Sequence, residues 1–252
     1  LMPWAAEALG IVPAFALAAA LGVAALAAVQ PLRRTVDAGR DRALRLHWRL
    51  FASIDNLRQP LATLIARPDL RRMGIAGGCL GAGQGAWFAF FVTYLVSVLH
   101  WSLTAAGALF ALMQAVSALG RPLVGFVSDR LGDGVRVLRW MACGSGIATL
   151  VLALSTPQWP TWTIVVLAVA GGLSVASWNG VQFAEVARMS PRETLNETMA
   201  GATLVLLGAY VLGPAVVGLV VTLGGSFRAA FAATALVTFA ALIPLGRVRP
   251  TV

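Results

Sequence analysis

The chain has 252 residues, of which 59% are apolar and only 12% are charged, whereas a soluble domain averages about 25% charged residues. This composition excludes disordered chains, nucleic-acid-binding modules and ordinary soluble enzymes, and it favours a protein that crosses a membrane several times. The net charge of +9 comes from arginine alone, because the sequence contains no lysine. In a membrane protein, such an excess reports first on topology.

Several apolar runs approach or exceed the ~20 residues that a helix needs to cross a membrane core of about 30 Å. There are seven of them: Trp4–Val29, Met73–Leu99, Leu103–Val127, Val137–Leu154, Thr161–Val186, Thr198–Leu223 and Phe227–Leu245. Backbone groups in lipid must form their hydrogen bonds internally, and the alternation typical of barrel strands is absent. We therefore predict an all-α membrane protein with seven transmembrane helices.

The arginines predict the orientation of these helices. Of the 19 arginines, all but Arg121 and Arg228 fall in segment 31–72, in the turns after the third and fifth runs, or in the C-terminal tail. Basic connections stay in the cytoplasm. We therefore expect the N-terminus outside, the C-terminus in the cytoplasm, and a multi-pass protein in the lipid bilayer of the cell inner (plasma) membrane.

Segment 31–72 is long for a connection between packed helices. It contains an amphipathic pattern, and Pro60 is expected to end that helix, with a short second helix following from Leu61 to Ala66. The apolar positions of the pattern are Leu44, Trp48, Phe51, Ile54 and Leu57. The segment is either a surface helix on anionic lipid or a solvated basic linker, and the pattern leaves both open.

A motif between the third and fourth runs resembles the signature loop of the major facilitator superfamily, which reads G-x-x-x-D-R-x-G followed by paired basic residues. The matching residues are Gly125, Asp129, Arg130 and Gly132, whereas Asp133-Gly134 replaces the basic pair. Two further stretches, 178–188 and 224–228, resemble the end of the family's tenth helix and the turn into its twelfth.

The resemblance implies a fold and a place within it. Family members have twelve helices in two halves, with the signature after the second and eighth helices. The seven runs would then be helices six to twelve: residues 1–30 the last helix of the first half, residues 31–72 the basic cytoplasmic linker, and residues 73–252 the six-helix C-terminal bundle. An odd helix count and a first residue that is not Met lead us to expect a fragment whose N-terminal half is missing.

Candidate substrate contacts follow from depth, because substrate binds near the membrane midplane in this family. Gln84 and Gln114 lie ~17 Å along their helices and Tyr210 lies ~18 Å along its helix, at 1.5 Å per residue. Trp87 lies one turn from Gln84, and the fifth run carries polar residues close together. The predicted substrate-binding residues are Gln84, Trp87, Gln114, Trp178, Asn179, Gln182 and Tyr210. The alternative for each is a structural bond between helices, worth about 0.6–2 kcal/mol.

The chemistry of the signature residues suggests what they do. Gly125 is small enough to let helices approach, and Asp129 could accept hydrogen bonds from the positive N-terminus of a neighbouring helix. In the family, such contacts are thought to latch one conformation of the transport cycle. The alternative is that Asp129 only solvates a helix end.

Arg121 and Glu185 are the charged residues that lie well inside the later runs, away from the first residues of a run. Because an intramembrane charge needs a partner, one hypothesis pairs them with each other. The other pairs Glu185 with Arg188, at a spacing of three residues on one helix.

These features predict transport of a small, neutral or weakly charged solute by alternating access, with a coupling proton or ion as a further candidate partner. No His, Cys, Asp or Glu cluster in the runs has catalytic or metal-binding spacing, so we expect no enzyme, cofactor or metal, and no nucleic-acid partner. The alternatives are a non-transporting half-transporter remnant and a seven-helix receptor.

Overall fold

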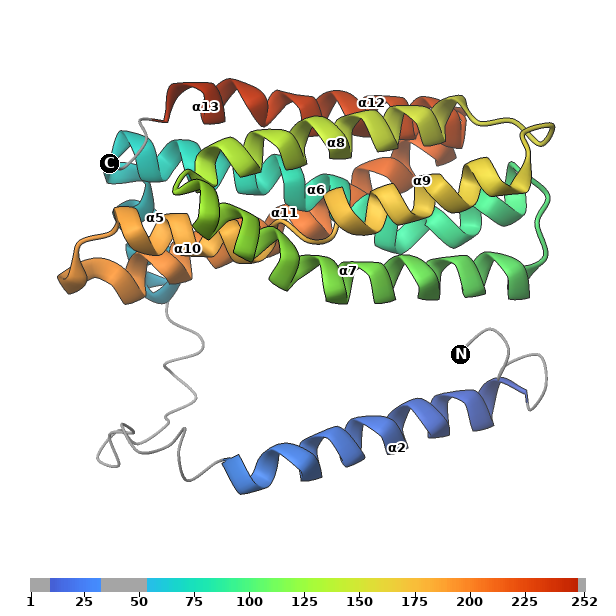
Figure 1. The fold of residues 1–252 in the computed structure, drawn as a ribbon, viewed down its shortest axis with the longest axis horizontal. Helices are drawn as coiled ribbons and strands as arrows, with labels where there is room; N and C mark the ends of the chain where they lie inside the picture. The colour runs from blue at the N-terminus through green and yellow to red at the C-terminus, as the bar shows by residue number, and fades with distance from the viewer. Residues whose placement is uncertain (1–9, 33–53, 249–252) are drawn as a thin grey trace.

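The computed structural model describes residues 10–32 and 54–248, and every regular element in those ranges is a helix (Figure 1). The elements are α2 (Ile11–Val29), η1 (Gln30–Leu32), α5 (Asp55–Ala66), α6 (Pro68–Ser97), α7 (Leu103–Leu131), α8 (Gly134–Leu154), α9 (Thr161–Ser174), α10 (Asn179–Met189), η3 (Arg192–Thr194), α11 (Leu195–Thr222), α12 (Phe227–Ala240) and α13 (Leu242–Arg247).

Six segments of the described chain are long and apolar enough to cross a membrane. They are α6, α7, α8, the α9–α10 pair, η3 with α11, and α12 with α13. The prediction of an all-helical membrane protein is therefore confirmed. Helix α2 is apolar throughout but is not one of the six, so the seventh span and the assignment to helices six to twelve stay predictions.

One predicted boundary is wrong, because Pro60 does not end a helix but lies inside α5. Helix α6 begins at Pro68, so the last residues of the segment predicted to be a linker are helical. Helix α5 is held against α11 by Glu197, whose carboxylate accepts hydrogen bonds from Gln59 (2.7 Å) and Thr63 (2.9 Å). This tertiary contact outweighs the poor helix propensity of proline. The rest of the amphipathic pattern, at positions 44, 48 and 51, falls outside the described residues.

The fifth predicted run is also not continuous, because it is interrupted between α9 and α10, over residues 175–178. No proline causes this break. The hydroxyls of Ser174 and Ser177 donate to the carbonyl oxygens of Ala170 and Gly172 on the preceding turn, a local bond that competes with the helical ladder and bends helices.

The interior of the described bundle has two large apolar clusters with a polar layer between them, and a small third cluster between α6, α11 and α12. One large cluster includes Leu70 and Leu138 near the arginine-rich end of the bundle, and the other includes Trp87 and Phe231 toward the opposite end. The layer lies near the middle of the spans, at the depth of the break. Its buried members are Gln84, Ser117, Ser145, Ser177 and Thr238.

Apart from Arg121 and Arg228, the arginines of the described spans lie at one end of the bundle, and several of them cap helices. Arg139 donates to the carbonyl of Leu245 at 2.8 Å, Arg67 to Met189 at 3.0 Å, and Arg72 to Arg247 at 2.9 Å. The acceptors lie near the C-termini of α13 and α10, where carbonyls lack helical partners and the dipole is negative. The same residues that predict sidedness therefore also complete the ends of helices.

Glycines set how closely α6 and α11 pack. A Cβ on Gly85 would collide with the carbonyl oxygen of Tyr210, and one on Gly213 would collide with that of Ala82. These two helices make the most extensive contact in the bundle, as expected where small residues let backbones approach in a membrane.

Gly85→Ala and Gly213→Ala should each destabilise the bundle by about 1–3 kcal/mol, because the added methyl group meets backbone that cannot yield. Gly208→Ala, on the same helix α11, is the matched control, since a Cβ there would meet nothing within 4 Å. Thermal unfolding of the purified protein in detergent measures the effect. Equal melting temperatures for all three variants would contradict the packing.

Candidate functional site

A pair of amide side chains lies at the centre of the bundle. Asn179, the first residue of α10, donates from Nδ2 to Oε1 of Gln84 on α6, at 3.2 Å. Gln84 is buried and Asn179 is half-buried. The break in the fifth span positions this contact, because it puts the start of a helix in the middle of the membrane-spanning region.

An aromatic group joins three helices beside this pair. The ring of Phe88 on α6 stands edge-on to Phe110 of α7 at 5.8 Å and to Tyr210 of α11 at 5.9 Å between centroids. All three side chains are half-buried, so part of each ring is accessible from outside the bundle. Phe110 was not among the predicted site residues. Its position one turn before Gln114, on the same face of α7, was the available signal.

The polar face of α7 meets the break directly. The carbonyl oxygen of Ala176 accepts from Oγ of Ser117 at 3.0 Å and from Nε of Arg121 at 3.3 Å. In return, Ser177 donates to the carbonyl of Ser117 at 3.3 Å. Side chains of α7 thus satisfy backbone groups that the interrupted helix leaves unpaired.

Three buried amide oxygens in the described chain have no hydrogen-bond partner: Oε1 of Gln114, Oδ1 of Asn179 and Oε1 of Gln182. A buried acceptor without a donor is costly. The atoms of Gln114 and Asn179 belong to half-buried side chains, and both can accept from a hydroxyl, an amine or water.

Three of the predicted contact residues lie in the core. Trp87 is fully buried, stacks on Phe91 at 5.0 Å, and donates from Nε1 to Thr149 at 2.9 Å. Trp178 is fully buried and donates to the carbonyl of Val175. Gln182 is 1% exposed and donates to the carbonyl of Met73 at 3.3 Å. These bonds give all three a structural role, and substrate contact by them stays a prediction.

The two charges inside the later spans do not pair with each other. Glu185 accepts from Arg188 at 2.7 Å, as in the second of the two hypotheses. The Glu185 carboxylate also packs against Gly134, where a Cβ would collide with it. Since the hydrogen bond of Arg121 goes to a backbone carbonyl, the Arg121–Glu185 pairing is corrected.

The signature residues occupy the end of α7 rather than a loop. Gly132, with φ 64°, provides the left-handed turn that ends the helix, as glycine commonly does. Asp133, not Asp129, caps the next helix, by accepting from the backbone N–H of Arg136 at 2.8 Å. Asp129 is exposed and forms no hydrogen bond or ion pair with the described chain, while Arg130 stacks over Phe126 at 5.3 Å.

Gly125 does not have the predicted contact role within this bundle. A Cβ built on it would meet nothing within 4 Å. Any helix that depends on its small size is therefore not one of the described six-span bundle.

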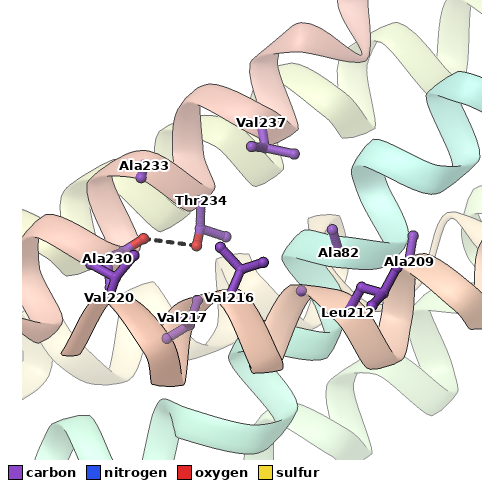
Figure 2. A pocket seen from close by; sticks show the side chains of 11 residues that line it. Ala82, Ala209, Leu212, Val216, Val217, Val220, Ala230, Ala233, Thr234 and Val237 are labelled. Carbon is purple, nitrogen blue, oxygen red and sulfur yellow. Dashed lines mark hydrogen bonds between the residues drawn. The ribbon is translucent and has the colours of Figure 1, made fainter. Parts of the chain in front are cut away.

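A separate cavity of about 290 Å³ lies between α11 and α12, with Ala82 of α6 also lining it (Figure 2). Thr234 is its polar side chain, and its hydroxyl already donates to the carbonyl of Ala230 at 2.8 Å, the dashed line in Figure 2. The rest of the cavity lining is apolar, so the amide and aromatic cluster is the better candidate site. Among the described residues, no group of three or more His, Cys, Asp or Glu side chains could hold a metal ion.

Comparison with known proteins agrees with the fold. The profile of the Major Facilitator Superfamily matches residues 1–182 and, in a second match, residues 73–251. An uncharacterized MFS-type transporter of Mycobacterium tuberculosis (strain CDC 1551 / Oshkosh) is 26% identical over 117 residues, which are 46% of this chain and 26% of that relative. The similarity thus spans about a quarter of the relative's length.

The profile matches cover nearly the whole chain, and the six apolar spans are what a multi-pass membrane protein requires. The chain belongs to the Major Facilitator Superfamily, a family of membrane transporters.

Proposed function

We propose that this chain forms one half of the solute pathway of a secondary transporter or facilitator that works by alternating access in the plasma membrane. The observation that carries the proposal is the polar and aromatic cluster near the middle of the spans, on the accessible side of α6, α7, α10 and α11. It holds the Gln84–Asn179 pair and the Phe88–Tyr210 contact. Mid-membrane polar groups are costly unless they face protein or a water-filled cavity.

A second bundle facing this one supplies such a cavity. Helices α7 and α11 are the least covered spans: 33% and 11% of their most apolar stretches are buried, against 61% for the α9–α10 segment. Both helices carry half-buried polar residues, Gln114 and Tyr210, on the uncovered side. We propose that an N-terminal six-helix bundle packs there and that the solute site lies between the two bundles.

The proposed contacts divide by accessibility. Half-buried Gln114, Asn179 and Tyr210 are placed to touch a solute, together with the ring of Phe88, and buried Gln84 acts on it through its bond to Asn179. The core residues Trp87, Trp178 and Gln182 hold these helices in position. A small solute with hydrogen-bonding groups and an apolar body fits this combination.

Uptake from a mixture of unlabelled solutes tests the function and needs no choice of substrate. Proteoliposomes of the full-length protein are incubated with a mixture of cell metabolites, and the contents are compared with protein-free liposomes by mass spectrometry. Gln84→Leu and Asn179→Leu should lower accumulation of the transported solute about tenfold, the effect of losing one hydrogen bond made in a dry site.

The matched control for that experiment is Thr222→Val, at the exposed end of α11, where the hydroxyl bonds only the carbonyl of Gly218. It should transport like the parent protein. If no solute accumulates above the protein-free level, the chain is not part of an active transporter. If both site variants match the parent, the site is placed wrongly.

Asp129→Asn should lower the transport rate while leaving the amount of protein in the membrane unchanged. The Asp129 carboxylate is exposed and has no partner within the described bundle, so it is available to a partner present in one conformation of the cycle. Initial uptake rates, normalised to membrane protein, measure the effect. An unchanged uptake rate would mean that Asp129 only solvates the end of its helix.

Cysteine labelling tests the orientation. In a background that lacks Cys79 and Cys143, Asp133→Cys should react with an impermeant maleimide only from the cytoplasmic side, because the basic end of the bundle should remain in the cytoplasm. Gln158→Cys, in the turn between α8 and α9, should react only from outside. Reaction of both from the same side would overturn the proposed topology.

A further inference from the structure

Arg121 carries a charge that the described bundle does not neutralise. Its Nε donates to the carbonyl oxygen of Ala176, while its terminal nitrogens have no hydrogen bond or ion pair with any described residue. The acid that the sequence offered as its partner, Glu185, is paired with Arg188 at 2.7 Å. A carbonyl oxygen satisfies one N–H of the guanidinium but supplies no negative charge.

The position of Arg121 makes this charge expensive. It lies ten residues before the end of α7, or ~15 Å at 1.5 Å per residue, inside the apolar part of the span. The other arginines of the described spans lie within about two turns of a helix end. Its side chain is exposed on the bundle. Exposed intramembrane charges face water or a partner, not lipid.

Its neighbours describe what the partner must be. Phe110, Gln114, Ser117 and Arg121 follow one face of α7, at spacings of four, three and four residues. The Ser117 hydroxyl already donates to the carbonyl of Ala176 at the break. The groups that remain for a partner are the ring of Phe110, the amide of Gln114 and the guanidinium of Arg121, spread along ~16 Å of helix. Oε1 of Gln114 and Oδ1 of Asn179 are both buried without a donor. Asn179 is the first residue of α10 and lies three residues after Ala176, whose carbonyl accepts from Arg121.

We propose that Arg121 binds the anionic group of the transported solute, so that the substrate class is small organic anions, chiefly carboxylates. This inference rests on the proposed transport function and adds the charge of its substrate. The planar guanidinium offers its two terminal nitrogens to a carboxylate in a fork geometry. A solute long enough to extend from Arg121 toward Gln114 can also donate a hydroxyl or amine to the unpartnered amide oxygens, once those side chains turn toward it.

Chemical modification tests the inference without a transport assay. Proteoliposomes of the full-length protein are treated with phenylglyoxal, which reacts with accessible guanidinium groups, and the rates at Arg121 and Arg228 are read by peptide mass spectrometry. The probes are acetate, lactate, succinate and benzoate, each compared with its neutral amide at equal ionic strength. At least one acid should slow modification of Arg121 about tenfold, the discrimination expected of a charge-assisted hydrogen bond, and its amide should not.

Arg228 is the internal control, since it is exposed at the first turn of α12, at the opposite end of the bundle. Its rate should be the same with every probe. Three outcomes would each overturn the proposal: no reaction at Arg121, which would place it against protein or lipid; no protection by any of the four acids; or equal protection by an acid and its amide.

Two variants of Arg121 separate the effect of its positive charge from that of its forked guanidinium geometry. The acid that protects Arg121 should raise the melting temperature of the parent protein and of Arg228→Gln, but not that of Arg121→Gln. Arg121→Lys should keep part of the shift, because a lysine retains the charge but not the fork. An undiminished shift in Arg121→Gln would place the anion elsewhere.

Failure of this inference differs from failure of the proposed function. A neutral solute taken up equally by the parent and by Arg121→Gln leaves transport standing and removes the anion site. Protection of Arg121 by an acid, with no uptake of any solute, leaves the anion site standing and removes transport.

Discussion

The arrangement of this bundle depends on one interrupted helix. Where α9 ends and α10 begins, backbone carbonyls lose their helical partners at a depth in the membrane where an unpaired polar group is costly. Side chains of two neighbouring helices supply the missing donors: Ser117 and Arg121 bond the carbonyl of Ala176, and Ser145 bonds that of Ser174 at 2.8 Å. The break therefore fixes the height of α7 and α8 against the fifth span.

The same break creates the polar centre. It brings the first residue of α10, Asn179, into contact with Gln84 and leaves amide oxygens without donors near the middle of the spans. Above and below it the interior is mostly apolar, with Gln182, Glu185 and Thr149 among the buried polar exceptions. A membrane protein that holds unsatisfied polar groups at this depth loses stability unless a cavity, water or a ligand completes them, and completion by a solute is what a transport site requires.

Arginines satisfy backbone carbonyls both at the basic end of the bundle and inside the span. At the basic end of the bundle, Arg67, Arg72 and Arg139 satisfy carbonyls near helix C-termini while their charges report the predicted side of the membrane. Inside the span, Arg121 caps a carbonyl in the same manner. There, however, no acid of the described bundle neutralises its charge, and a charge at that depth needs water or a partner.

The sequence by itself determined the helical membrane class, six of the spans and the family, because apolar run length and the signature residues Gly125, Asp129, Arg130 and Gly132 are local properties of the chain. Counting residues along each helix also predicted mid-membrane depth for Gln84, Gln114 and Tyr210, but it predicted Asn179 to lie closer to the cytoplasm, whereas the structure bonds Asn179 to Gln84. Only the tertiary structure decided that α5 continues through Pro60, that the fifth span breaks at residues 175–178, and that Glu185 pairs with Arg188 rather than Arg121. Each of these outcomes depends on which neighbouring helix places a hydrogen-bond donor, a charge or empty space beside the residue. The hydrophobic period of a single helix does not show which helices are its neighbours.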